Sequence, residues 1–157
     1  MKKLITILIL TVLFISCSSD DDSGETQQDS KLKSFEQPLV TFGTSQNEIE
    51  YRMGDDYDTE PNGLSIGYKM VYAGTRDGEY QRAYSIDNDM DLWKTEVRYY
   101  GSNLDVIKSG LKSNYGEPTI GGGNGVTIYR YDTETLHVEL SYSNENETSI
   151  VEFSEPN

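Results

Sequence analysis

The chain has 157 residues, of which 27 are acidic and 13 basic, so its formal net charge is −14. A surface this acidic repels the phosphate backbone of nucleic acids, which excludes nucleic acid as a partner. Because Cys17 is the only cysteine, a disulfide within the chain is also excluded, and hydrophobic packing must hold the folded part together.

The first 17 residues have the pattern of an export signal. Lys2 and Lys3 give a positive start, an apolar run follows from residue 4 to residue 15, and Ser16 precedes Cys17. The run is short for a membrane-spanning helix, which needs about 20 apolar residues. An ordinary secretory signal, or an N-terminal membrane anchor with an incidental cysteine, is the alternative interpretation.

The segment Phe14-Ile15-Ser16-Cys17 resembles the lipobox of bacterial lipoproteins, although Phe14 stands where that family usually has leucine. The resemblance implies that residues 1–16 are a signal peptide and that Cys17 becomes a lipidated N-terminus. Several acyl chains on one cysteine anchor a protein stably, whereas a single chain does so only marginally. The expected partner of this end of the chain is therefore the membrane.

Residues 17–33 contain almost no apolar side chain, so we expect a flexible acidic tether. Within it, Ser19 and the run Asp20, Asp21 and Asp22 resemble the export signal of surface lipoproteins in some Gram-negative bacteria. That resemblance implies the outer leaflet of the outer membrane, facing outward. A solvated tether with retention in the inner leaflet is the alternative.

The remaining residues, 34–157, suffice for one domain with a real core. Capping residues, glycine stops and hydrophobic periodicity predict two helices, each followed by three strands. The predicted helices cover about 45–53 and 102–115. The predicted strands cover about 64–72, 80–86 and 93–99 in the first half and 126–130, 136–142 and 149–153 in the second half.

This repeated order predicts an α+β fold: an antiparallel sheet with two helices on one face, built from tandem α-β-β-β units at about 42–101 and 102–156. Helix ends at Met53-Gly54 and Tyr115-Gly116-Glu117-Pro118 resemble small envelope lipoprotein domains. Relatives of that kind are the small lipoprotein subunit of the outer-membrane β-barrel assembly machine and the β-lactamase-inhibitor-protein type. The resemblance implies a fold and carries over no functional residue.

Catalytic and metal-binding patterns are weak, and we expect no catalytic residue, no metal and no cofactor. His137 is the only histidine and is expected on a strand surface; a Ser-His-Asp site stays open, but no Gly-x-Ser-x-Gly motif occurs. The acidic runs 58–63 and 87–91 alternate like calcium loops, yet Lys69 and Arg98 replace the glutamate that closes an EF-hand. Ordinary acidic turns are favoured, with a weak calcium site as the alternative.

Aromatic residues give the best indication of binding. Most strand tyrosines share a face with apolar residues and are expected in the core. Tyr100, Tyr129 and Tyr131 fall on the opposite parity, where they would form an exposed patch for a protein or a glycan. The sequence therefore favours a non-catalytic, lipid-anchored, surface-exposed binding module of the outer membrane. An accessory subunit of an outer-membrane assembly or transport complex is the alternative, and a hydrolytic enzyme comes third.

Overall fold

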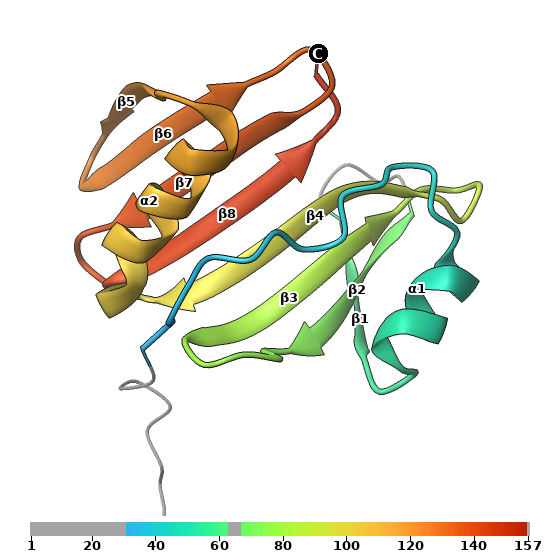
Figure 1. Cartoon of the computed structure of the whole chain (residues 1–157). Coiled ribbons are helices and arrows are strands. Elements are labelled where there is room, and N and C mark those ends of the chain that lie inside the picture. Colours follow the sequence, from blue (N-terminus) through green and yellow to red (C-terminus); the bar gives the residue numbers. More distant parts are fainter. Residues whose placement is uncertain (1–30, 63–66, 157) are drawn as a thin grey trace, which may run out of the picture.

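The computed structural model describes residues 31–62 and 67–156 (Figure 1). The expected signal and export residues, Cys17, Ser19, Asp20, Asp21 and Asp22, lie outside these ranges. Within the described part, no helix is long and apolar enough to cross a membrane. The elements in chain order are α1 (Gln46–Met53), β1 (Asp58–Pro61), β2 (Tyr68–Ala73), β3 (Glu79–Ile86), β4 (Leu92–Tyr100), the short 3₁₀ helix η2 (Gly101–Asn103), α2 (Leu104–Tyr115), β5 (Thr119–Gly123), β6 (Val126–Asp132), β7 (His137–Ser143) and β8 (Thr148–Ser154).

All eight strands form one antiparallel sheet in the order β1-β2-β3-β4-β8-β7-β6-β5. Each half of the chain contributes a helix followed by a four-stranded meander. The two meanders meet where β4 pairs with β8, in a register that sets Val97 opposite Val151. This junction leaves β1 at one edge of the sheet and β5 at the other.

The expected α+β class, with two helices on one face and three strands per unit, is wrong. The fold is dominated by the eight-stranded sheet, and its helices are short, with 8 residues in α1 and 12 in α2. Four strands follow each helix, because β1 and β5 form where loops were expected. The helices bury few side chains, namely Ile49 of α1 and Ile107 and Leu111 of α2.

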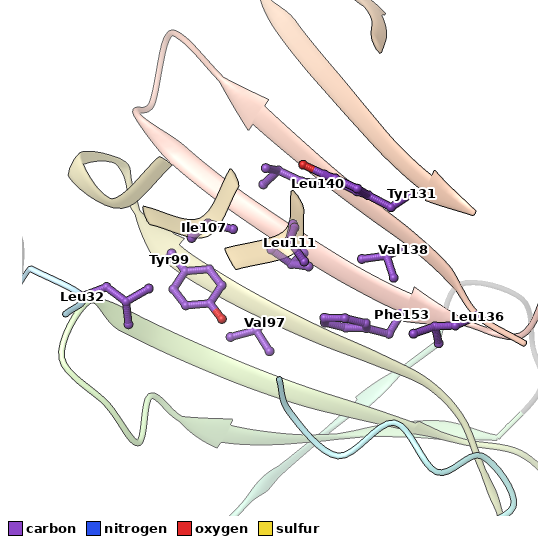
Figure 2. Packing of buried hydrophobic residues seen from close by; sticks show 11 residues of the cluster. Leu32, Val97, Tyr99, Ile107, Leu111, Tyr131, Leu136, Val138, Leu140 and Phe153 are labelled. Atoms are coloured by element: carbon purple, nitrogen blue, oxygen red, sulfur yellow. The ribbon is translucent and has the colours of Figure 1, made fainter. Parts of the chain in front are cut away.

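The core lies on one side of the sheet as two apolar clusters. Cross-strand register places Met70, Tyr84, Thr95, Phe153 and Val138 in one row along this side. The cluster under α1 contains Ile49, Met70, Tyr72, Tyr84, Ile86 and Leu92. The cluster under α2, which Figure 2 shows, contains Leu32, Val97, Tyr99, Ile107, Leu111, Tyr131, Leu136, Val138, Leu140, Val151 and Phe153.

An extended segment, residues 31–45, supplies much of the remaining cover, and we call it the strap. It crosses the sheet between α2 and α1, drawn blue to cyan in Figure 1. Leu32 is buried in the cluster under α2, where its N–H donates to Asn103 Oδ1 at 2.7 Å. Farther along, Thr95 Oγ1 donates to the Leu39 carbonyl at 2.6 Å, and Phe42 packs against both clusters. The packed domain therefore includes Leu32, which lies inside the range expected as tether.

Candidate functional site

The side of the sheet that faces away from α1, α2 and the strap is the candidate site, and we call it the open face. Its residues alternate with the core residues along each strand, because side chains on a strand point to opposite sides in turn. Glu96 of β4, Glu152 of β8, Glu139 of β7 and Arg130 of β6 stand in one row across it. The next row contains Lys69, Ser85, Lys94, Ser154, His137 and Asp132.

Ion pairs link these two rows and a third row that contains Arg98. Three glutamates opposite one another on neighbouring strands would repel, since like charges directly opposite in a sheet are destabilising. Here each glutamate has at least one cation. The pairs are Lys69–Glu96 at 3.3 Å, Arg98–Glu96 at 2.6 Å, Lys94–Glu152 at 2.8 Å and Arg130–Glu139 at 2.9 Å. His137 and Asp132 hydrogen-bond to each other within one row.

Glu96 is the most buried member of this network, with 6% of its side chain exposed. The small residues Ala83 and Ser85 of the neighbouring strand are also buried, so the long charged side chains lie over them. Burial opposes ionisation of Glu96, but the hydrogen bond from Arg98 and the charge of Lys69 outweigh it. The pKa of Glu96 therefore lies below its ordinary value.

Aromatic side chains lie next to the ion pairs. The rings of Tyr80 and Tyr100 are 4.9 Å apart between centroids, and Lys94 Nζ is 5.8 Å from the centroid of the Trp93 ring. Irregularities in the β3–β4 register place an extra residue at Tyr80 and another at Trp93. Such bulges redirect side chains, so Tyr80 lies beside Tyr100 on the open face, although the strand period of two predicts it in the core. Aromatic and charged groups of this kind are enriched in protein interfaces.

The predicted exposed patch of Tyr100, Tyr129 and Tyr131 does not form, because two of these tyrosines lie on the core side of the sheet. Tyr131 is 2% exposed and belongs to the core cluster under α2, against which Tyr129 is also packed. The register explains this, because Tyr129 is opposite Leu140 and Tyr131 is opposite Val138. Of the three predicted residues only Tyr100 lies on the open face, and its aromatic neighbour there is Tyr80.

His137 lies between Asp132 and Ser154 in one row of the open face. Its Nδ1 hydrogen-bonds to Asp132 Oδ1, and Ser154 is its cross-strand neighbour on the other side. Asp132, His137 and Ser154 thus stand side by side in the order of an acid-base-nucleophile triad. In a triad the serine hydroxyl donates to the histidine, whereas here Ser154 Oγ donates to the Glu155 carbonyl at 3.3 Å. Hollows of about 330 to 570 Å³ lie along the strap, α2 and β1, and His137 lines none of these.

The acidic runs have structural roles. Asp58 to Pro61 form strand β1, which pairs with β2. In the turn after β3, Asp87 Oδ1 accepts the backbone N–H groups of Asp89 at 2.9 Å and Asp91 at 3.0 Å. Among the residues that the structure describes, no group of three or more His, Cys, Asp or Glu side chains is placed to hold a metal ion.

Comparison with known proteins gives one informative likeness, and it concerns the fold. No family model and no curated protein matches the chain. The crystal structure of a DUF4309 family protein, YjgB of Bacillus subtilis, is similar with a TM-score of 0.53 and 12% sequence identity. The similarity covers 84% of this chain and 92% of that chain, so the two proteins share the sheet-dominated architecture over most of their lengths.

Proposed function

We propose that the protein is a non-catalytic binding module, anchored to the outer membrane through lipidated Cys17, and that it binds a protein or a glycan with the open face of its sheet. The observation that carries the proposal is the difference between the two sides of the sheet. One side is covered by the helices and the strap, whereas the other presents an ion-pair network beside Tyr80, Tyr100 and Trp93.

The ion pairs support binding for a physical reason. Side chains that already hold each other in place lose little rotamer freedom when a partner arrives, so less of the binding free energy is spent on ordering them. Charges of both signs across the open face also favour a partner with a complementary charge pattern. The tyrosine pair adds rigid aromatic area, the kind of group that dominates interface energetics.

An accessory subunit of an outer-membrane complex is the second candidate, and a hydrolase stays third. The row Asp132, His137 and Ser154 is the observation in favour of a hydrolase. A triad enzyme needs hydrogen-bond donors for an oxyanion and a pocket that binds the substrate at the triad. One described hollow is lined by Leu136 and Glu155, the sequence neighbours of His137 and Ser154, but none of the three residues of the row lines it.

The experiment is purification of the full lipidated chain from intact cells that were first labelled with a membrane-impermeant biotin reagent. We expect the chain to carry biotin and to copurify a specific partner, and we expect Tyr100→Ala to reduce that partner at least about tenfold, as for an interface hot spot. Tyr51→Ala is the matched control, because Tyr51 is 87% exposed on α1 and away from the open face.

The outcomes separate the candidates. A stoichiometric integral outer-membrane protein would favour the accessory subunit over a stand-alone binder. Equal partner recovery from both tyrosine variants would exclude the open face as the binding surface, and a chain without biotin would exclude display at the cell surface.

A further inference from the structure

The two edges of the sheet are protected differently. Edge strands expose unpaired N–H and C=O groups, and proteins commonly blunt them with charged residues or proline. At one edge, β1 carries Asp58, Glu60 and Pro61 within four residues. At the other edge, β5 has the sequence Thr-Ile-Gly-Gly-Gly, without a charge or a proline, and all five of its residues are exposed.

The glycines of β5 are not all explained by the fold of one chain. Gly122 has a φ of +125°, and a Cβ there would lie 2.2 Å from the Val126 carbonyl oxygen, so glycine is required. Gly121 and Gly123 have no such φ, and a Cβ at either would meet nothing within 4 Å. Glycine weakens a strand interior, and its presence often marks close approach by another backbone or a ligand.

Two exposed apolar side chains lie near the same edge, one on each side of the sheet. Ile120 of β5 is 68% exposed on the side of Tyr129, and Val126 of β6, directly opposite Gly123, is 37% exposed on the other side. The other large apolar side chains that are exposed in the described part are Tyr51 and Met90, on α1 and on the turn after β3. The β5 edge thus combines the outward backbone N–H and C=O groups of an edge strand, exposed glycines that have no side chain, and the exposed side chain of Ile120.

We propose that β5 pairs antiparallel with β5 of a second copy of the chain, about a twofold axis through Gly121. In this register Gly121 is opposite Gly121, Ile120 is opposite Gly122 and Thr119 is opposite Gly123 of the other copy. Each Ile120 then lies beside the bare backbone of a glycine, which explains an isoleucine next to glycines on an exposed edge.

The absence of charged residues on β5 favours a second copy of the chain as the partner of this edge. Two copies with a net charge of −14 each repel, but an uncharged β5 sets no like charges opposite one another in the shared ladder. Pairing through β1 would bring Asp58 and Glu60 of both copies together, and Pro61 lacks the N–H that a ladder needs. Because β5 pairs with itself, the association closes as a dimer and does not extend into a filament.

The contact is small, since a five-residue edge buries less than the roughly 1,600 Å² of a standard stable interface. We therefore expect a weak dimer whose population rises with concentration. The inference does not depend on the proposed function, because the open face remains uncovered in the paired sheet.

The test is disulfide crosslinking of full-length chains in the cells that express them, under mild oxidation. Gly121→Cys places two thiols opposite each other on the axis, at a Cα separation of about 4.5 to 5.5 Å that suits a disulfide. We expect a covalent dimer from this variant. Gly123→Cys is the matched control, because two residues at that position are roughly 13 Å apart in the proposed register. Mixed Thr119→Cys and Gly123→Cys chains should crosslink.

A second pair of variants tests the register without disulfides. Gly121→Glu and Gly121→Lys each set like charges on the axis, and each should abolish copurification of two differently tagged copies. Coexpressed Glu and Lys chains should restore it. Equal crosslinking at 121 and 123, no crosslink at 121, or copurification that persists in both single-charge variants would overturn the proposal.

Discussion

At the scale of single residues, Glu96 shows how the open face is stabilised. Its carboxylate accepts from Arg98 at 2.6 Å and from Lys69 at 3.3 Å, and 6% of its side chain is exposed. A buried carboxylate without cations would be unfavourable, and removal of one partner from such a group is more costly than loss of a surface pair.

Glu96→Gln is expected to lower the free energy of unfolding by about 2 kcal/mol, because it leaves two cations without their counter-charge. The pKa of Glu96 is lowered in the folded state, so its contribution is fully present above the ordinary value of 4.5 and is lost as the pH falls through the folded pKa. The difference between wild type and variant should thus shrink in acid. Urea unfolding as a function of pH, followed by the fluorescence of Trp93, measures it.

Glu139→Gln is the control for this prediction. Arg130 and Glu139 are 47% and 21% exposed, so their pair is expected to contribute less than about 1 kcal/mol. Equal losses from the two variants, or a Glu96→Gln loss that grows as the pH falls below 4, would contradict the account.

Side-chain direction was the least predictable property of single residues. In β6 both alternating sets contain apolar residues: Val126 and Ile128 stand on the side of Arg130, and Tyr129 and Tyr131 stand on the other. The apolar start of the strand favoured the wrong set as the buried one, and the tyrosines were assigned to the wrong side. Tyr80 was misplaced for another reason, because the register irregularity at that residue breaks the period of two.

At the scale of elements, the helices and the inner strands were predictable and the edge strands were not. The α1 and α2 helices begin and end within two residues of the predicted ranges, since capping residues, glycine stops and apolar spacing mark them. By contrast, β1 and β5 are exposed along their whole length. A strand with no buried side has no hydrophobic alternation, so both were interpreted as loops.

The strap is an element that periodicity does not reveal, because an extended segment of mixed residues has no regular pattern. Leu32→Ala is expected to lower the free energy of unfolding by about 2 kcal/mol, since it removes a buried side chain from the cluster under α2. Lys33→Ala changes the adjacent exposed residue and should have little effect. Thermal unfolding of both variants measures the difference, and similar midpoints would show that the strap does not stabilise the core.

At the scale of the whole molecule, two meanders joined at β4 and β8 form one sheet with two unlike sides and two unlike edges. The sequence predicted the succession of helix and strands in each half but missed the edge strands β1 and β5, so it underestimated how far the sheet dominates the fold. It placed Tyr100 correctly opposite the core and could not anticipate Tyr80 beside it. The covered side maintains the fold, and we propose that the open face binds a partner and that the β5 edge joins two copies.

The most direct measurement of the central claim is site-specific photocrosslinking in intact cells. A photoreactive phenylalanine replaces Tyr100 on the open face in one strain and Tyr51 on α1 in another. We predict a discrete crosslinked adduct from position 100 and none from position 51. An adduct from position 51 alone, or the absence of any adduct from position 100, would contradict the assignment of the open face as the binding surface.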